Sequence, residues 1–252
     1  MKQYKVAIIG NGMICNAAHI PAYKAMGDKV KIVAVADIRE EAAKETAERH
    51  GIPKYYVDPY KMLEEEKPDI ISVCTPNAYH KEYTLAGFRA GCHVVCEKPV
   101  AVTCADAEEM FNAAEKAGKH LFVIQSLRFT GNFKAAAGLA KSGCLGDIYY
   151  ADLNLVRRRG VPRWGMFHMA KENVGGAFCD LGVHMCDYLM SISGNPKMVS
   201  VSGSAVTRIV NKEKNIEFSN AESGAPTGLF TPRKFDMKEF DVEEFANGYI
   251  RL

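Results

Sequence analysis

Two short stretches of the sequence hold side chains that can move a proton at neutral pH. The first is Glu97-Lys98-Pro99, and the second places Asp180 and His184 four residues apart, after Gly175-Gly176. Residues four apart at the start of a helix share one face, so these two side chains can act together. Histidine titrates near neutrality and a carboxylate can orient its ring, which suits the pair to proton transfer beside a cationic lysine. Taken alone, the same spacing also fits a helix N-cap followed by a surface histidine.

A glycine-rich turn follows the first apolar run of the chain. The run at residues 4–9 ends in Gly10-Asn11-Gly12-Met13-Ile14-Cys15, where the dinucleotide fingerprint G-x-G-x-x-G/A has cysteine in its last position. The first glycine permits a tight turn, the second lets the main chain approach a pyrophosphate, and the following helix start offers free amide groups to the phosphates. Cysteine is small enough for the third position. We therefore expect a dinucleotide to contact Gly10, Gly12, Met13 and Ile14.

An acidic residue stands where the second strand is expected to end. Asp37 follows Gly12 by about 25 residues, the distance at which a carboxylate accepts hydrogen bonds from the adenosine ribose. Such a carboxylate repels a 2′-phosphate and so favours NAD over NADP. Arg39 weakens this preference because an arginine could pair with that phosphate. Asp37 could equally cap the next helix, which does not exclude contact with the cofactor.

The N-terminal half alternates short apolar runs with amphipathic helices. Strands are expected at residues 4–9, 30–36, 69–73, 93–96 and 121–124, and helices at 13–26, 40–50, 79–90 and 105–117, with a short one from Pro59. Continuous apolar strands separated by helices are typical of a parallel sheet that is covered on both faces. The pattern predicts a doubly wound α/β domain of the Rossmann type.

Polar residues follow the later strands of this predicted sheet. Ligands of doubly wound sheets bind at the carboxyl ends of the strands, so residues at these positions should line one crevice. The residues concerned are Thr75, Pro76, Asn77 and His80 after the strand expected at 69–73, Glu97 and Lys98 after the one at 93–96, and Gln125 after the one at 121–124. We expect all of them to lie near the cofactor.

The pattern changes after about residue 126. A helix is expected at residues 132–141, a long strand at 147–158, a helix at 181–191 and a further strand at 198–210, while residues 211–241 are polar and carry loop signals. This pattern indicates a C-terminal α+β domain with an open, mostly antiparallel sheet. We therefore divide the chain into a dinucleotide-binding domain, residues 1–126, and a substrate and oligomerisation domain, residues 127–252.

Composition narrows the possible partners. The 252 residues carry a formal net charge of +2, which gives no footprint for nucleic acid, and no apolar run reaches the roughly 18–20 residues needed to cross a bilayer. The N-terminus lacks the features of a signal peptide, so a cytoplasmic location is expected. The eight cysteines form no CxxC pair. His184 and Asp187 lack a convincing third ligand, and no metal site is expected.

These motifs together resemble the Gfo/Idh/MocA oxidoreductase family over nearly the whole chain. The resemblance rests on the glycine turn with Asp37, residues 75–80, Glu97-Lys98-Pro99, Arg128-Phe129, Gly146, and Gly175-Gly176 followed by Asp180 and His184. It implies that Lys98, Asp180 and His184 are the catalytic set, and that a secondary hydroxyl of a sugar or cyclitol is oxidised with NAD. It also implies that Trp164 lies near the nicotinamide, although tryptophan more often packs in a core.

The resemblance leaves several points open. Family chains usually continue for roughly another 100 residues, so the sequence resembles a truncated form whose second sheet is incomplete, or a form that a partner subunit completes. We expect a homo-oligomer formed through the C-terminal sheet. A NAD-dependent glycosidase of the related type is an alternative function, and a non-catalytic dinucleotide sensor or an inactive fragment is another. The Arg157-Arg158-Arg159 run could attract an acidic substrate, although a solvated strand edge explains it as well.

Overall fold

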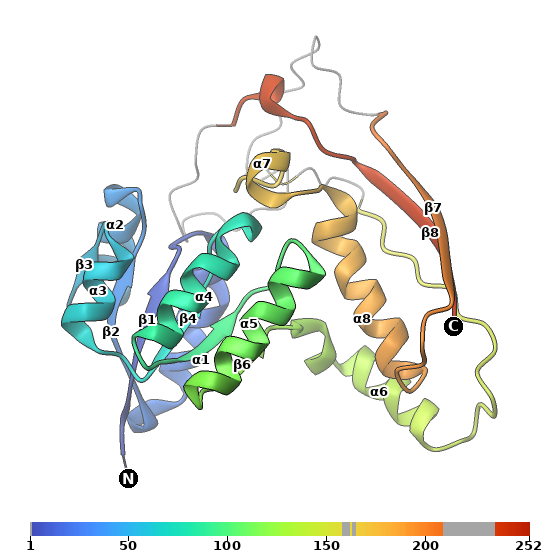
Figure 1. Cartoon of the computed structure of the whole chain (residues 1–252), viewed down its shortest axis with the longest axis horizontal. Coiled ribbons are helices and arrows are strands. Elements are labelled where there is room, and N and C mark those ends of the chain that lie inside the picture. The colour runs from blue at the N-terminus through green and yellow to red at the C-terminus, as the bar shows by residue number, and fades with distance from the viewer. Residues whose placement is uncertain (1, 158–161, 163–164, 209–234) are drawn as a thin grey trace.

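The computed structural model describes residues 2–157, 162, 165–208 and 235–252. Its larger part is built on six parallel strands in the order β3-β2-β1-β4-β5-β6, which is the Rossmann order. The strands are β1 (Tyr4–Ile9), β2 (Val30–Ala36), β3 (Tyr55–Tyr56), β4 (Ile70–Val73), β5 (His93–Cys96) and β6 (Leu121–Val123). The predicted doubly wound sheet is confirmed, and its strand order reverses between β1 and β4 (Figure 1).

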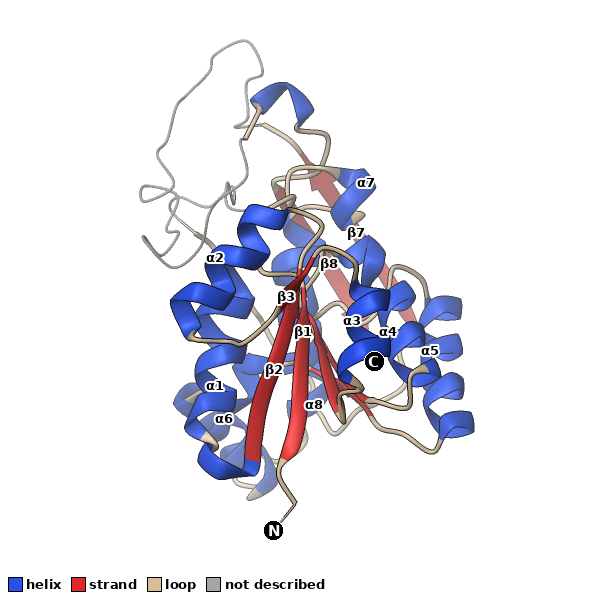
Figure 2. Ribbon diagram, turned by 90° about the vertical axis from the view of Figure 1, so that its left-hand side faces the viewer, coloured by secondary structure: helices blue, strands red, loops and turns tan. Residues whose placement is uncertain are grey.

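Helices cover both faces of this sheet (Figure 2). One face packs against the π-helical turn η1 (Cys15–His19), α1 (Ile20–Ala25) and α2 (Glu40–His50), and the other against α3 (Pro59–Glu66), α4 (His80–Arg89) and α5 (Cys104–Ala117). Strand β1 serves both faces because successive side chains of a strand alternate. Val6 and Ile8 enter the cluster under α1, whereas Ala7 and Ile9 enter the cluster under α3, α4 and α5.

Local sequence signals fix the ends of these helices. Asp58 caps α3 by accepting hydrogen bonds from the amides of Tyr60 and Lys61, and Thr103 caps α5 through the amide of Asp106. Helix α5 ends at Gly118, whose φ of +60° is the left-handed conformation that glycine adopts without cost. Short 3-10 turns, η2 (Gly27–Lys29) and η3 (Asn77–Tyr79), precede β2 and α4.

The smaller part combines helices with a two-stranded sheet (Figure 1). Its elements are η4 (Ser126–Phe129), α6 (Gly131–Lys141), α7 (Ala170–Asn173), the π-helical turn η5 (Phe178–Gly182), α8 (Val183–Ile192), η6 (Met237–Glu239), and the antiparallel strands β7 (Ser200–Val206) and β8 (Phe245–Arg251). Helices α6 and α8 meet through an edge-to-face contact of Phe133 and Tyr188. The antiparallel sheet is confirmed, and the division at residues 126 and 127 stays a prediction.

One predicted strand of this part is wrong. Residues 147–157 form neither strand nor helix, and residue 158 lies outside the described residues. No described strand pairs with this stretch, since the described sheet of this part contains β7 and β8 alone. Tyr149 within the stretch is 97% exposed. The predicted loop at residues 211–241 lies mostly outside the described residues.

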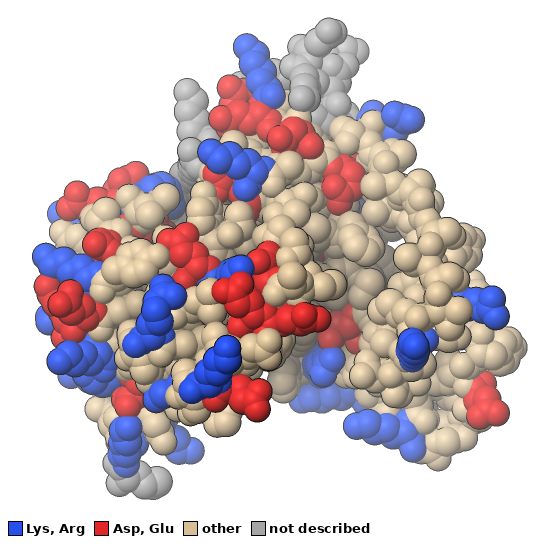
Figure 3. Space-filling view, in the orientation of Figure 1, with Lys and Arg blue, Asp and Glu red and all other residues tan. Residues whose placement is uncertain are grey.

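Charged side chains of both signs are interspersed over the face shown in Figure 3. Among the described residues, no helix is long and apolar enough to cross a membrane.

Candidate active site

The turn after β1 has the shape that a pyrophosphate requires. Gly10 has a φ of +91°, and a Cβ on it would lie 2.6 Å from the carbonyl carbon of Cys74, so no other residue fits there. A Cβ on Gly12 would have no atom within 4 Å, which leaves open space above the turn. Met13 and Ile14 begin the helix that follows, where amide groups lack partners inside the helix. The residues present therefore fit a dinucleotide phosphate.

Cys15 occupies the third position of the fingerprint, with its side chain in the core. Its side chain is fully buried and packs with Val6, Ile8 and Val35 in the cluster under α1. Burial raises the pKa of this thiol to about 12, so it stays protonated and acts as a small apolar side chain. Cysteine thus provides the close packing of helix on strand for which the motif usually uses glycine or alanine.

Asp37 is held in place by main-chain amides at the end of β2. One oxygen accepts from the amide of Asn11 at 2.7 Å and the other from the amide of Arg39 at 2.9 Å. The N-cap of α2 is Arg39, so Asp37 does not cap that helix. Because each carboxylate oxygen can accept more than one hydrogen bond, the carboxylate keeps capacity for a ribose diol. The Arg39 guanidinium lies 3.8 Å from the same carboxylate.

The residues after β4 have two different surroundings, the end of the strand and the smaller part of the molecule. The Oγ1 atom of Thr75 is buried, and no described residue gives it a hydrogen bond. Asn77 instead contacts the smaller part: its Nδ2 donates to the main-chain oxygen of Asn173 at 3.0 Å. Pro76 connects the two. At the start of this loop, next to β4, Thr75 therefore has a polar atom without a described partner, and further along Asn77 binds the loop to α7.

His80 lies beneath the crevice, where its side chain is fully buried. Its Nδ1 is 2.7 Å from the carbonyl oxygen of Pro99, and its Nε2 is 3.0 Å from that of Thr75. Burial lowers the pKa of this histidine, whereas the two carbonyl oxygens, which can only accept, favour a proton on each ring nitrogen. His80 thus joins the loops after β4 and β5, and its place at the cofactor stays a prediction.

Glu97 also points inward from the end of β5. The residue is 8% exposed, and its Oε1 lies 2.8 Å from Nε2 of His19 on η1. Its Oε2 accepts from the amide of Lys98 at 3.3 Å. Behind His19, Nδ1 lies 3.2 Å from the hydroxyl of Ser72, which in turn lies 2.7 Å from the hydroxyl of Tyr23.

Lys98 joins the two parts of the molecule. Its Nζ donates to Oδ1 of Asp180 at 2.8 Å and to the main-chain oxygen of Asp180 at 2.9 Å. The side chains are only 15% and 16% exposed, so water competes weakly for this ion pair. Arg157 approaches the second carboxylate oxygen at 3.6 Å. The structure thus brings together the lysine and the aspartate that the sequence placed 82 residues apart.

His184 takes its orientation from a different partner than the motif suggests. Its Nδ1 lies 3.2 Å from Oε1 of Gln125, which as an acceptor requires the N–H to be on Nδ1. Asp180, the partner expected from the spacing, is engaged by Lys98 instead. Burial, with the positive charge of Lys98 as the next cause, lowers the pKa of His184 below its usual value. The lowered pKa favours the neutral ring near pH 7, and no described residue gives Nε2 a hydrogen bond.

The double glycine before Asp180 is required because the main chain at Glu243 passes close to Gly176. A Cβ on Gly176 would lie 1.9 Å from the main-chain oxygen of Glu243, which accepts from the amide of Ala177 at 3.0 Å. The Glu243 carboxylate accepts from the amides of Gly176 and Phe178, both at 2.8 Å. A carboxylate at this helix start also complements the helix dipole. Glu243, just before β8, thus fixes the turn η5 on which Asp180 stands.

The remaining predicted positions have other roles or cannot be placed. Asp187 pairs with Arg128 through two guanidinium nitrogens, Nε and Nη2. No group of three metal-ligating side chains occurs among the described residues. Trp164 lies outside the described residues, as do Arg158 and Arg159. Sequence reasoning missed His19, Ser72, Tyr23 and Glu243, because their partners are distant in the chain and no local motif marks them.

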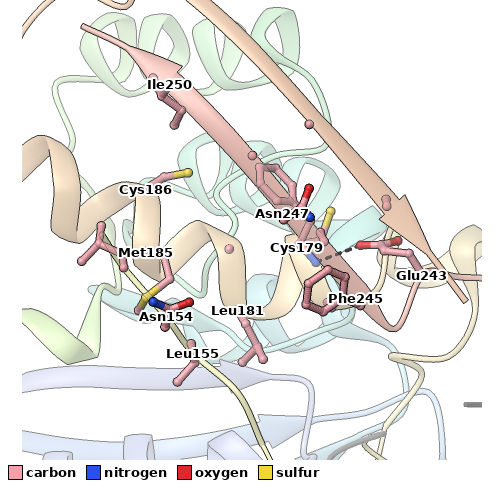
Figure 4. A pocket seen from close by; sticks show the side chains of 18 of the residues that line it. Asn154, Leu155, Cys179, Leu181, Met185, Cys186, Glu243, Phe245, Asn247 and Ile250 are labelled. Carbon is pink, nitrogen blue, oxygen red and sulfur yellow. Dashed lines mark hydrogen bonds between the residues drawn. The ribbon is translucent and has the colours of Figure 1, made fainter. Parts of the chain in front are cut away.

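A cavity of about 1790 Å³ borders Asp180 on the side of the smaller part (Figure 4). The sheet of β7 and β8, the helical segment η5–α8 and the extended residues 148–157 surround it. Leu155, Leu181 and Met185 contribute apolar surface, and Asn154 and Asn247 contribute amides. The ion pair of Lys98 and Asp180 thus lies between the cofactor turn and a space large enough for a sugar-sized molecule.

Comparison with known proteins identifies the family of the chain. Residues 4–125 match the model of an oxidoreductase family with an NAD-binding Rossmann fold, and residues 133–250 match the GFO/IDH/MocA C-terminal domain. The chain is 36% identical over 248 residues to D-glucoside 3-dehydrogenase of Escherichia coli K12, which covers 98% of this chain and 68% of that protein. It is 30% identical over 190 residues to myo-inositol 2-dehydrogenase of Thermotoga maritima, covering 75% of this chain and 55% of that protein.

The fold is shared with solved structures of longer proteins. The WlbA dehydrogenase from Bordetella pertussis, crystallised with NADH and UDP-GlcNAcA, superposes with a TM-score of 0.79 at 22% identity, over 99% of this chain and 67% of that one. GenD2 from gentamicin A biosynthesis, in complex with NAD, has a TM-score of 0.75 at 20% identity, over 99% of this chain and 62% of that one. The chain therefore spans between about half and two thirds of the length of these proteins. By sequence and fold, it belongs to the Gfo/Idh/MocA family of oxidoreductases.

Proposed function

We propose that this chain is an NAD-dependent dehydrogenase that oxidises a secondary hydroxyl of a sugar or cyclitol, or reduces the corresponding ketone. The observation that carries the proposal is the buried ion pair of Lys98 and Asp180, held at the carboxyl end of β5 with the neutral His184 nearby. The relatives named as dehydrogenases of a glucoside and of an inositol support the substrate class.

The cofactor is proposed to lie across the carboxyl ends of the strands. The turn of Gly10 and Gly12, with the first amides of the following helix, would bind the pyrophosphate, and Asp37 would accept from the adenosine ribose. The nicotinamide half would lie against the loops that contain Thr75, Glu97 and Gln125, with Trp164 as a further proposed contact. When bound, NAD supplies the hydride acceptor. The carboxylate of Asp37 disfavours the 2′-phosphate of NADP.

The chain's own residues would handle the proton. As the carbinol loses a hydride, its hydroxyl proton must also leave, and Nε2 of the neutral His184 can take it because Nδ1 faces Gln125. The Lys98 ammonium can donate a hydrogen bond to the substrate oxygen as negative charge develops there. Asp180 orients this ammonium, since it accepts through both a side-chain and a main-chain oxygen.

Absorbance of the reduced cofactor tests this function. A panel of glucosides, free sugars and cyclitols is incubated with the purified chain and NAD, and in parallel with NADP. We expect NADH to accumulate with at least one compound and NADP to be used less. Cleavage of a glucoside without accumulation of NADH would instead indicate the glycosidase. Absence of turnover, together with absence of a thermal shift with either cofactor, would refute the proposal.

We also propose that the protein forms a homo-oligomer through the sheet of β7 and β8. Phe245 and Tyr249 share one face of β8 and are 51% and 80% exposed, and exposed apolar groups of this kind favour association. Light scattering on the wild type and on Tyr249→Asp tests this, with an oligomer expected for the first and dissociation for the second. A monomeric wild type would contradict it.

A cytoplasmic location is proposed from the cysteines. All eight are free thiols, and Cys104 and Cys144 are exposed, which suits a reducing compartment. Cell fractionation should recover the protein with cytoplasmic markers, and recovery in a periplasmic or secreted fraction would contradict this assignment.

A further inference from the structure

A line of four buried polar side chains leads from α1 to the base of the catalytic lysine. It consists of Tyr23, Ser72, His19 and Glu97, with successive contacts of 2.7, 3.2 and 2.8 Å between Tyr23 and Ser72, Ser72 and His19, and His19 and Glu97. All four residues are at most 8% exposed. Buried polar groups are costly unless they are paired, so such a line calls for an explanation beyond packing.

The carboxylate of Glu97 sets the direction of hydrogen bonding at one end of this line, because it can only accept and therefore requires an N–H on Nε2 of His19. At the other end, burial raises the pKa of Tyr23 to about 12, so its phenol keeps its proton and can donate to Ser72. The Ser72 hydroxyl can in turn donate to Nδ1 of His19. Nε2 donates to Oε1 of Glu97, and every group in the line is satisfied. The carboxylate at its end thereby receives a charge-assisted hydrogen bond.

The other oxygen of Glu97 connects this line to the reaction centre. Oε2 accepts from the main-chain amide of Lys98 at 3.3 Å, and the side chain of Lys98 extends from there to Asp180. With the carboxylate fixed by His19, the peptide that carries Lys98 is fixed as well. His19 ends the π-helical turn η1, which begins three residues after Gly12. One helical segment thus joins the cofactor turn to the lysine.

We infer that His19 is a positioning residue, which fixes the Glu97 carboxylate and through it the direction in which Lys98 reaches Asp180. This inference rests on the proposed function, since Lys98 is the group being positioned. His19 is 7% exposed and lies behind Glu97, so its proposed role is to position that carboxylate. Ser72 and Tyr23 fix its ring and tautomer in turn.

Three variants test the inference. His19→Leu removes the donor to Glu97, and we expect kcat to fall by about 10- to 100-fold, the effect of losing one charge-assisted hydrogen bond, while the Kd for NAD changes less than about threefold. His19→Gln retains an N–H near the position of Nε2 and should recover kcat to within about threefold. His120→Leu makes the same exchange at an exposed histidine before β6, at the opposite end of the sheet, and should leave kcat unchanged.

The outcomes separate the inference from a merely structural role. A His19→Leu variant that keeps kcat within twofold would overturn it, as would equal losses in His19→Leu and His19→Gln. If His19→Leu fails to fold, ¹⁵N NMR of wild-type His19 decides: a proton on Nε2 is expected, and a ring without a proton on Nε2 would overturn the inference.

The same NMR measurement keeps this inference separate from the proposed function. If the wild type turns over no substrate at all, the proposed function fails. The contact between His19 and Glu97 is then judged from the ¹⁵N chemical shifts of the His19 ring, which should change in Glu97→Gln. Unchanged chemical shifts in Glu97→Gln would show that the two side chains do not interact.

Discussion

Replacing Lys98 by methionine isolates the chemical role of its ammonium group. Methionine keeps most of the apolar length of the side chain and removes both hydrogen bonds to Asp180, at 2.8 and 2.9 Å. Because the pair is only about 15% exposed, water cannot replace the lost donor effectively. The glycine turn follows β1 and Asp37 follows β2, and neither contacts the pair of Lys98 and Asp180. Binding of NAD should therefore be preserved.

The expected size of the effect follows from this burial. Loss of one preorganised donor to a developing oxyanion costs on the order of 10²- to 10³-fold in kcat, or about 2.7–4 kcal/mol. We therefore expect kcat of Lys98→Met to fall by at least about 100-fold, while the Kd for NAD from calorimetry stays within about threefold. Initial rates of NADH formation at saturating NAD give kcat.

Lys81→Met is the matched control. Lys81 on α4 also pairs with carboxylates, at 2.6 Å from both Asp106 and Glu109, but it is 33% exposed and lies outside the site. This variant should keep the activity of the wild type. Near-wild-type turnover in Lys98→Met, or equal losses in the two variants, would refute the role assigned to Lys98.

Three further predictions concern the pKa of His184, the choice of cofactor and the glycine turn. Burial and the charge of Lys98 lower the pKa of His184, so its ring should titrate below 6.5 by NMR and shift upward in Lys98→Met; a shift downward would contradict this. Asp37→Ser should improve the Kd for NADP relative to NAD by about tenfold or more, since repulsion of the 2′-phosphate is removed; an unchanged ratio in calorimetry would contradict it. Gly176→Ala places a Cβ 1.9 Å from a carbonyl oxygen and should lower the unfolding free energy by about 1–3 kcal/mol. Gly138→Ala adds a Cβ in open space and should not lower it. Equal Tm values for the two variants would contradict this prediction.

The Rossmann half could be predicted well because its signals are local. Apolar strands such as residues 30–36, the glycine turn at Gly10 and the helix stop at Gly118 each specify their own conformation. The position of Lys98 at the crevice followed from strand order alone, as ligands bind at the carboxyl ends of such sheets. Here local preference and overall fold agree.

The contacts within the site were less predictable, since they depend on pairing between distant segments. The alternation in residues 147–158 resembled a strand, but a strand needs a partner, and β7 pairs with β8. The i, i+4 spacing suggested that Asp180 orients His184, whereas Gln125, 59 residues away, faces the ring. His19 and Glu97 are 78 residues apart, and no motif connects them.

A crystal structure of the chain with NAD bound would test the central claim most directly. The account predicts the pyrophosphate at the turn of Gly10 and Gly12, the adenosine ribose on the carboxylate of Asp37, and the nicotinamide ring beside Lys98. A dinucleotide bound elsewhere, or a nicotinamide ring remote from Lys98 while the pyrophosphate occupies the turn, would contradict it.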